Sequence, residues 1–352
     1  MRYLLTTDPG IESIVIDELR ERGLGEKACP RPYDAAGQVR LVADGIDGLL
    51  ELTTIHDIIE IRHEARAATL EEIGAALSEV DFPELDDAGS FRVTTERVGE
   101  HDFRTTDVQR VAGAAVYRRH GTRVDLEQFD VDVRVNLYGD HLIAGIRRTQ
   151  GSLGNRIRRS KALRSSLKPT IAVAMLRLVG AHRGAGSLID PMCGTGTIPI
   201  EARQINPRLE VRASDWDDET VEVARDTIGN HELDIPVECF DARKLGDVHP
   251  GRFDYIVTDP PYGVRQARRT SMVHLYESIL PQFERALKPT GSIALVVVKY
   301  RTFLVALEGT GLRITHERPI DLGGLHPRIL VMGSGLEMQH SSKVVNGDIP
   351  DF

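Results

Sequence analysis

The chain turns from a strand into a helix at Leu188-Ile189-Asp190-Pro191-Met192-Cys193-Gly194-Thr195-Gly196-Thr197-Ile198. The apolar residues before the aspartate predict a buried strand, and Ile198–Gln204 predicts the following helix. Two glycines allow positive φ and a close approach of a ligand to the backbone, and the helix N-terminus offers unpaired N–H groups. The third glycine of the dinucleotide fingerprint is missing. The loop alone is therefore compatible with a nucleoside-type ligand or with a tight structural turn.

Two further acidic residues follow at the ends of the next expected strands. Asp215 follows the strand Glu210–Ser214, about 20 residues past the glycines, where a carboxylate can accept hydrogen bonds from both ribose hydroxyls. Asp241 follows Val237–Phe240, in a position to receive an adenine amino group. Each acid alone is compatible with a surface or helix-capping role. Their order after the glycine loop favours a nucleoside cofactor.

A second motif, Val257-Thr258-Asp259-Pro260-Pro261-Tyr262-Gly263, ends the expected strand Phe253–Thr258. The two prolines stiffen the turn and donate no N–H, so the loop is rigid and rich in acceptors. A planar group that bears an NH₂ fits such a loop. Asp259 and the Pro260 carbonyl can each accept one N–H, which aims the nitrogen lone pair at an electrophile, while Tyr262 stacks on the ring. The alternative is an ordinary proline turn with an aspartate cap.

Together the two motifs resemble class I S-adenosylmethionine-dependent methyltransferases of exocyclic or amide nitrogens, whose shared motif is [N/D]-P-P-[Y/F]. The resemblance implies in-line methyl transfer from S-adenosylmethionine, dominated by positioning, and no metal. It implies a catalytic loop of Asp259, Pro260, Pro261 and Tyr262. Cys193, in the cofactor loop, is expected to be a small packing residue. The cofactor-binding candidates are Asp190, Cys193, Gly194, Thr195, Gly196, Thr197, Asp215, Trp216, Asp241, Ala242, Lys168, Pro169 and Thr170.

The N-terminal half has a different order of predicted elements, with strands paired antiparallel and helices between them. Val131–Leu137 and His141–Ile146 predict a hairpin that turns at Tyr138-Gly139-Asp140. Phe91–Phe103, the helix Asp107–Arg119 and the hairpin resemble a THUMP domain, and the preceding 60 residues resemble the ferredoxin-like domain that accompanies it. In that family the pair grips the 3′ acceptor end of tRNA.

The fold class is therefore α/β, with a class I, Rossmann-like methyltransferase domain behind an α+β ferredoxin-like and THUMP module. The alternation of strands and helices from Ser187 to Met332 predicts a parallel sheet. We expect five segments: a ferredoxin-like domain 1–60, a THUMP domain 61–146, a basic linker and helix 147–168, a methyltransferase domain 169–336 and a polar tail 337–352.

Charge is unevenly distributed along the chain, whose net charge is −9. Residues 1–140 hold 16 Lys/Arg against 29 Asp/Glu, and residues 190–352 hold 18 against 24. Residues 141–189 hold 10 basic residues and no acid. Such a belt is typical of a surface that follows phosphates, and the alternative is a solvated linker. The RNA-binding candidates are Arg147, Arg148, Arg156, Arg158, Arg159, Lys161 and Arg164.

From end to end the chain resembles the archaeal and bacterial THUMP-containing tRNA guanine-N2 methyltransferases. Leu322–Ile329 resembles the branch that acts on guanosine 6, whereas Asp259 in place of Asn resembles the branch that acts on guanosine 10. Lys168 stands where the family often has Asn. Alternatives from other classes are a DNA adenine or protein glutamine N-methyltransferase, and an RNA-binding protein with an inactive transferase half.

Composition limits the classes of protein to which the chain can belong. The 352 residues are 41% hydrophobic and 28% charged, as in an ordinary soluble protein. We expect a cytoplasmic monomer without a membrane span, because no apolar run approaches about 20 residues and the N-terminus lacks a signal-peptide pattern. Cys29, Cys193 and Cys239 lie far apart, which argues against a disulfide framework or a zinc module.

Overall fold

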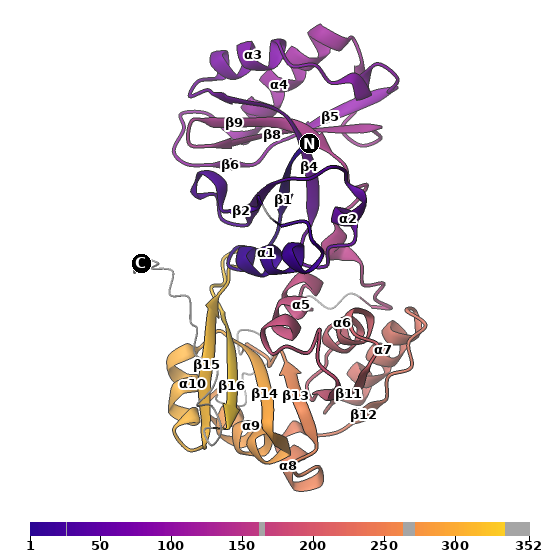
Figure 1. Ribbon diagram of the computed structural model, residues 1–352, viewed down its shortest axis with the longest axis vertical. Helices are drawn as coiled ribbons and strands as arrows, with labels where there is room; N and C mark the ends of the chain where they lie inside the picture. The colour runs from indigo at the N-terminus through magenta and orange to yellow at the C-terminus, as the bar shows by residue number, and fades with distance from the viewer. Residues whose placement is uncertain (26, 162–165, 263–271, 335–352) are drawn as a thin grey trace. The chain divides into compact units, whose positions relative to one another are not determined.

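The computed structural model describes residues 1–25, 27–161, 166–262 and 272–334 and divides the chain into two compact units (Figure 1). The first unit comprises Met1–Ile157, Lys168–Ala174 and Ile320–Gly324, and the second comprises Arg158–Leu167, Met175–Pro319 and Leu325–Phe352. No described helix has both the length and the apolar character that a membrane span requires.

A single nine-stranded sheet organises the first unit, in the order β2-β3-β1-β4-β9-β8-β5-β7, with β6 paired to β8. Its strands are β1 (Arg2–Thr6), β2 (Cys29–Pro30), β3 (Gln38–Val42), β4 (Asp57–Arg66), β5 (Ser90–Thr94), β6 (Arg97–Val98), β7 (Arg123–Val124), β8 (Val131–Tyr138) and β9 (His141–Arg147). Its helices are α1 (Glu12–Glu21), α2 (Asp47–Leu50), α3 (Leu70–Ser78) and α4 (Thr105–His120).

Local sequence explains where several of these elements begin and end. Thr69 and Glu72 form a capping box that starts α3, and Gly121, at φ +71°, ends α4. The predicted β8–β9 hairpin is confirmed, with its turn at Gly139 and Tyr138 paired to His141.

Strand β4 joins the parts of the sheet that come from residues 1–60 and 61–146. Residues 57–60 pair with β1 and residues from Ile59 to Arg66 pair with β9, so Ile59 and Glu60 pair with both neighbours. The expected boundary between residues 60 and 61 falls inside this strand. The two parts therefore form one continuous sheet, because a 10-residue strand is long enough to pair with both.

The second unit contains a seven-stranded sheet in the order β12-β11-β10-β13-β14-β16-β15. Its strands are β10 (Gly186–Asp190), β11 (Leu209–Asp215), β12 (Val237–Cys239), β13 (Phe253–Thr258), β14 (Leu287–Val297), β15 (Leu312–Pro319) and β16 (Arg328–Ser334). Its helices are α6 (Thr197–Ile205), α7 (Asp218–Gly229), α8 (Leu245–Val248), α9 (Met272–Ala286) and α10 (Tyr300–Leu307). Helix α5 (Pro169–Leu178) begins in the first unit and ends in the second.

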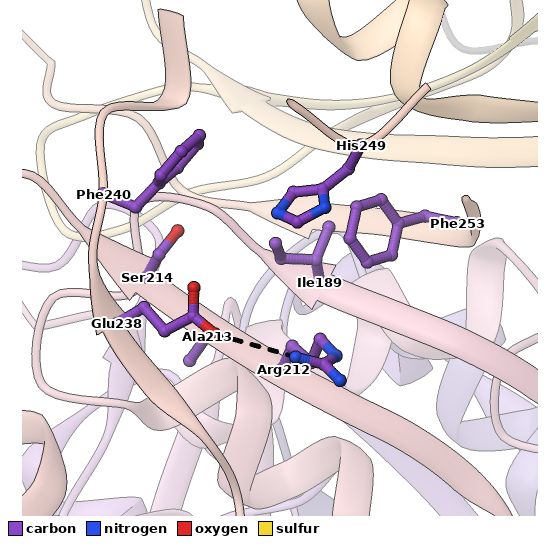
Figure 2. A pocket seen from close by; sticks show the side chains of 8 residues that line it. All are labelled: Ile189, Arg212, Ala213, Ser214, Glu238, Phe240, His249 and Phe253. Atoms are coloured by element: carbon purple, nitrogen blue, oxygen red, sulfur yellow. Dashed lines mark ion pairs between the residues drawn. The ribbon is translucent and has the colours of Figure 1, made fainter. Parts of the chain in front are cut away.

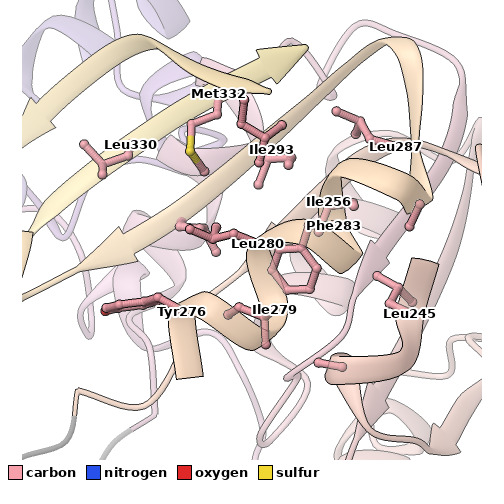
Figure 3. Close-up of a cluster of buried hydrophobic side chains, with 14 of the residues drawn as sticks. Leu245, Ile256, Tyr276, Ile279, Leu280, Phe283, Leu287, Ile293, Leu330 and Met332 are labelled. Carbon is pink, nitrogen blue, oxygen red and sulfur yellow. The ribbon is translucent and has the colours of Figure 1, made fainter. Parts of the chain in front are cut away.

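Strands β10 to β14 run parallel, and β16 pairs antiparallel with both β14 and β15. This arrangement confirms the predicted mostly parallel α/β sheet. A buried cluster around Tyr276, Phe283 and Leu330 packs α9 against β14 and β16 (Figure 3). Helix α10, which the sequence analysis did not predict, contributes Phe303 to the same cluster. The carboxyl ends of the parallel strands meet at one edge, where ligands bind in such folds.

Candidate active site

Asp190 lies at the carboxyl end of β10, at the centre of the sheet. It is 1% exposed, and its Oδ1 accepts hydrogen bonds from the Thr258 hydroxyl at 2.6 Å and the Met192 N–H at 3.2 Å. Burial raises the pKa of this carboxyl to about 8. Asp190 therefore ties the end of β10 to the end of β13, so that the two loops that follow leave the sheet side by side.

The glycine loop after β10 adopts the conformation that its sequence predicts. Gly194 and Gly196 have φ of +53° and +85°, and a Cβ on Gly194 would meet nothing within 4 Å. Gly196 precedes α6 without a side-chain cap, so the first N–H groups of the helix receive no help from its N-cap side chain. The loop thus combines open space with backbone donors, which suits a polar ligand.

Three neighbouring side chains of this loop are buried. Cys193 has a thiol whose pKa burial raises well above its usual range, and its N–H donates to the Ser214 carbonyl at 2.9 Å. This fits the expected packing role. The Thr195 hydroxyl donates to Ser166 at 3.3 Å, and the Thr197 hydroxyl accepts from Arg159 at 3.3 Å. Both threonines therefore position the loop.

Asp215 and Trp216 follow at the end of β11. Oδ2 of Asp215 accepts the Gly194 N–H at 3.1 Å, and Oδ1 accepts the Asp217 N–H at 3.3 Å. Burial raises the pKa of Asp215. Trp216 is 73% exposed beside this carboxylate. The exposed indole ring provides a flat surface on which a base can stack. Asp215 and Trp216 together can therefore hold a ribose and a base.

Asp241 is already engaged. Its carboxylate accepts hydrogen bonds from the Arg243 guanidinium at 2.7 and 3.0 Å, and from the Arg243 N–H at 2.9 Å. The hydrogen bond from the Arg243 side chain lowers the pKa of Asp241. Ala242 is buried behind it. Arg243 was not predicted for the site, although its place two residues after the acid allows such a contact.

The catalytic candidates lie on the loop after β13. Oδ1 of Asp259 is buried and has no hydrogen-bond partner among the described residues, while the Tyr262 phenol hydrogen-bonds to this carboxylate. Burial raises the pKa of Asp259 to about 7. Pro260 is buried and Pro261 half-buried in the same rigid turn. A buried acceptor without a donor is costly, and it fits a substrate N–H.

Tyr276 on α9 was not predicted for the site. Burial, together with the Asp259 charge, raises the pKa of its phenol to about 12. Its position thirteen or more residues beyond the loop gave no local signal in the sequence. The phenol stays neutral near Asp259 and adds to the apolar surroundings of that carboxyl.

Both halves of the chain match known protein families. Residues 156–328 match the family described as an RMKL-like methyltransferase domain, and residues 67–146 match the THUMP domain. A tRNA (guanine(6)-N2)-methyltransferase from Thermus thermophilus is 34% identical over 93% of this chain and 98% of its own length. Its counterpart from Archaeoglobus fulgidus is 30% identical over 94% and 92%.

The chain belongs to the THUMP-containing tRNA (guanine-N2)-methyltransferase family. The crystal structure of TrmN from Thermus thermophilus superimposes on it with a TM-score of 0.84 at 32% identity, covering 95% of this chain and all of the other. The resemblance seen in the sequence is thereby confirmed, as is the fold class.

Family resemblance placed Lys168, Pro169 and Thr170 at the cofactor pocket, but the structure gives two of these side chains another partner. Lys168 and Thr170 both donate to the buried carboxylate of Asp8 in the first unit, and His56 contacts the same carboxylate at 3.1 Å. These partners lower the pKa of Asp8 to about 2 in spite of its burial. A buried charge requires such compensation. Pro169 is buried between the two donors.

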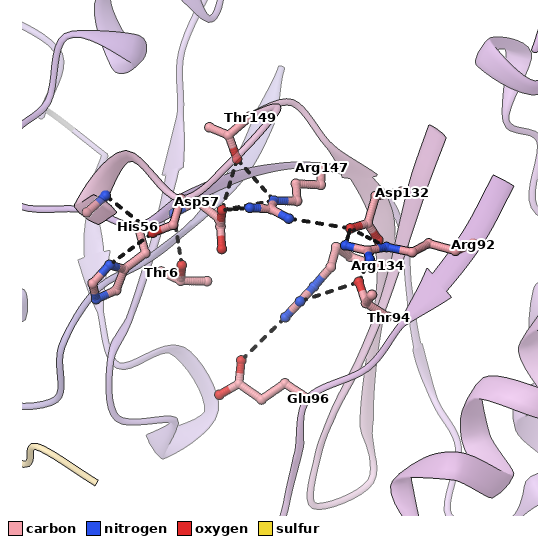
Figure 4. A network of polar contacts seen from close by, with 12 residues as sticks. Thr6, His56, Asp57, Arg92, Thr94, Glu96, Asp132, Arg134, Arg147 and Thr149 are labelled. Carbon is pink, nitrogen blue, oxygen red and sulfur yellow. Dashed lines mark hydrogen bonds and ion pairs between the residues drawn. The ribbon is translucent and has the colours of Figure 1, made fainter. Parts of the chain in front are cut away.

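Two arginines of the basic belt in this methyltransferase are neutralised within the first unit. Arg147, 15% exposed, pairs with Asp57 at 2.6 Å and with Asp132 at 3.6 Å (Figure 4). Arg148, 26% exposed, pairs with Glu60 and Glu84. These ion pairs join β9 and the residue that follows it to β4, and they reduce the charge that Arg147 and Arg148 can offer to a phosphate.

The other belt residues differ in exposure. Arg159 donates to the Leu167 carbonyl and to Thr197, and burial lowers the pKa of its guanidinium. Arg156 donates to the Leu153 carbonyl. Arg158 and Lys161 are exposed, and Arg164 lies outside the described residues. Among the described RNA-binding candidates, Arg158 and Lys161 therefore carry the most accessible positive charge.

A pocket in the second unit extends from Phe253 at the start of β13 to Phe240 just past the end of β12. It is lined by Ile189, Arg212, Ala213, Ser214, Glu238, Phe240, His249 and Phe253 (Figure 2). Sheet register pairs Ser214 with Glu238, and an ion pair joins Glu238 to Arg212 across the same face. None of the lining residues was predicted for cofactor binding or catalysis.

Proposed function

We propose that this protein methylates the exocyclic N2 of a guanosine in tRNA, at position 6, with S-adenosylmethionine as methyl donor. Two relatives that are named for this reaction align with almost the whole chain. The observation that carries the proposal is the buried Oδ1 of Asp259, which lacks a donor among the described residues. A guanine amino group brings the N–H that this atom needs.

The residues around the glycine loop fit the cofactor. Asp215 would accept the ribose hydroxyls, the exposed Trp216 ring would cover the adenine, and the loop at Gly194 has room for the rest. Asp241 would share its carboxylate between Arg243 and the adenine amino group. When bound, S-adenosylmethionine supplies an electrophilic methyl group on a positively charged sulfur.

The catalytic loop orients the amine. Asp259 and the Pro260 carbonyl each accept one N–H of the guanine amino group, and Tyr262 stacks on the base. The nitrogen lone pair then points away from the ring and would form the new N–C bond as the bond between the methyl group and sulfur breaks, with S-adenosylhomocysteine as the leaving group. The nitrogen would lose one proton to solvent after or during the transfer. Most of the rate enhancement comes from this positioning. Because position 6 lies in a helical stem, the base must leave its stack to reach the loop.

Binding of tRNA is assigned to the THUMP domain and to the accessible part of the belt. The exposed side chains of Arg158 and Lys161 carry the charge that a phosphate backbone needs. Replacement of both by glutamine is expected to weaken tRNA binding and flatten its salt dependence. Unchanged tRNA binding across a salt titration would indicate that the belt is a solvated linker. We further propose a cytoplasmic monomer.

The reaction is tested with unmodified tRNA transcripts, labelled S-adenosylmethionine and nucleoside analysis of the digested product. We expect N2-methylguanosine, and its loss when guanosine 6 is replaced by adenosine but not when guanosine 10 is replaced. Asp259→Ala is expected to abolish transfer and leave tRNA affinity within a few-fold. Methyladenosine as the product, or methylation of DNA or protein in place of tRNA, would refute the proposal. Loss only with the position-10 replacement would assign the chain to the other branch, with which it shares Asp259.

A further inference from the structure

Three side chains form a closed cluster near the carboxyl end of β14. The Tyr300 hydroxyl donates to Oε2 of Glu317 at 2.6 Å, and the Arg328 guanidinium pairs with Oε1 of the same carboxylate. The guanidinium carbon also lies 4.4 Å above the centre of the Tyr300 ring. Arg328 is therefore held in one orientation from two sides, yet its side chain remains 39% exposed.

Two more cations stand beside this cluster at the start of α10. Lys299 and Arg301 flank Tyr300, both are exposed, and neither makes an ion pair within the described part of the chain. The first turn of α10 contains no acidic residue. Cations at a helix N-terminus are repelled by the helix dipole. Three cationic residues thus belong to this cluster or flank it in the chain, and Glu317 is the one acid that contacts the cluster within the described residues, an arrangement that favours an anion.

The cluster lies at the same edge of the sheet as the catalytic loop. Strand register pairs Thr258, the last residue of β13, with Leu295, and Leu295 with Leu330. With neighbouring strands about 4.8 Å apart, the backbones of Thr258 and Leu330 are about 10 Å from one another. Arg328, which pairs with Val297, lies two residues beyond that row, on the side on which the catalytic loop leaves β13.

Side-chain packing links the same two places. Phe303, one turn into α10 from Tyr300, meets the Tyr276 ring edge-on, with 5.2 Å between the ring centres. Tyr276 in turn is close enough to Asp259 for that charge to raise the pKa of its phenol. The start of α10 is thus held in a fixed relation to the catalytic carboxylate.

We infer that Lys299, Arg301 and Arg328 form a phosphate-binding site for the RNA backbone next to the target guanosine. The inference rests on the proposed function and extends it to residues outside the basic belt. A planar guanidinium that is already oriented matches the oxygens of a phosphodiester. Gripping the backbone beside a base that has left its stack would hold that base in the catalytic loop.

Binding of fluorescent tRNA to the full-length chain over a range of salt concentrations tests the site. Arg328→Gln, and separately Lys299→Gln with Arg301→Gln, are expected to weaken binding about five- to tenfold and to lower the slope of log Kd against log salt by about 1 for each lost phosphate contact. Arg328→Lys keeps the charge and is expected to retain the slope. Arg313→Gln is the matched control. This exposed arginine stands opposite Gly333 in the register of β15 and β16, at the edge of the sheet away from the catalytic loop.

Two further readouts separate a phosphate contact from a damaged fold. Quenching of the single tryptophan, Trp216, by S-adenosylhomocysteine is expected to be unchanged in Arg328→Gln. An acceptor-stem minihelix that contains guanosine 6 should show the same loss of slope as whole tRNA. The weaker tRNA binding of the glutamine variants must also appear as a higher KM for tRNA, while the KM for the cofactor stays unchanged.

Wild-type slopes and KM values in both glutamine variants would overturn the site, as would a loss seen with whole tRNA but not with the minihelix. Suppression of the wild-type affinity by inorganic phosphate at millimolar concentration, with no effect of the variants on the salt slope, would assign the cluster to a free anion. Failure of the proposed function is distinct, because it would leave the wild-type enzyme without N2-methylguanosine product whatever the binding slopes.

Discussion

Asp259→Asn is the most informative single change in this enzyme, because it removes one charge and keeps the shape of the side chain. The carboxylate is buried, and burial raises its pKa from 3.8 to about 7. The asparagine amide oxygen can still accept the substrate N–H, as the [N/D]-P-P-[Y/F] motif implies. The variant therefore separates the geometry of the loop from its ionisation.

The expected change in stability follows from the raised pKa. The folded protein binds a proton at Asp259 that the unfolded chain has already lost between pH 3.8 and about 7, so folding stability falls as the pH rises through this window. A pKa raised by about 3 units corresponds to a loss of at most about 4 kcal/mol in the free energy of unfolding. This loss is complete above pH 7 and absent below pH 4. Asp259→Asn should recover much of this free energy of unfolding at pH 8 and little at pH 4.

The expected change in rate has the opposite sign. A charged acceptor makes a hydrogen bond roughly twice as strong as a neutral one, so Asp259→Asn should slow methyl transfer at pH 8 by about tenfold, equivalent to about 1.4 kcal/mol. The wild-type rate should fall about tenfold for each pH unit below about 7, because protonation removes the acceptor charge. The rates of the two enzymes should therefore converge near pH 6.

Single-turnover methylation of tRNA from pH 5.5 to 9, together with chemical denaturation at the same pH values, measures both effects. Asp234→Asn, an exposed acid of the same unit, serves as the control. The difference between wild type and Asp259→Asn isolates this carboxyl from Asp190, whose raised pKa titrates in an overlapping range. A stability gain of equal size at pH 4 and pH 8, or a constant ratio of rates across the pH range, would refute the reasoning.

Other changes test other parts of the structure. Trp216→Ala should weaken S-adenosylhomocysteine binding about tenfold in calorimetry, since stacking contributes about 1 kcal/mol or more, whereas Trp216→Phe should bind nearly normally; equal affinities would exclude stacking. Arg148→Ala should lower the free energy of unfolding by about 1–3 kcal/mol, because Glu60 and Glu84 lose a shared donor, while the salt slope of tRNA binding stays constant. Asp8→Asn should destabilise the protein by about 2 kcal/mol at pH 7, since the lowered pKa of Asp8 stabilises the fold above pH 3.8 and this contribution is lost as the pH falls through about 2. Denaturation curves at pH 7 and pH 2.5 that show the same loss would contradict that assignment.

The sequence by itself determined the elements that depend on neighbouring residues. The strand–glycine loop–helix at Asp190–Ile198 and the rigid turn at Asp259–Tyr262 were both predicted, because glycine and proline act on the backbone at their own positions. Alternating polarity and turn residues likewise predicted the β8–β9 hairpin. Strand ends follow from the same local rules, so the meeting of Asp190, Asp215 and Asp259 at one sheet edge could be expected from a parallel α/β order.

Only the tertiary structure decided which charges are available. Arg147 and Arg148 belong to a stretch without acids, yet their partners Asp57 and Glu60 come from a strand about 90 residues earlier. Lys168 likewise meets Asp8, 160 residues away. Ion pairing depends on distance in space, which a count along the chain does not contain. For the same reason the sequence alone did not predict a site at Lys299 and Arg328, which the sheet register brings to one edge.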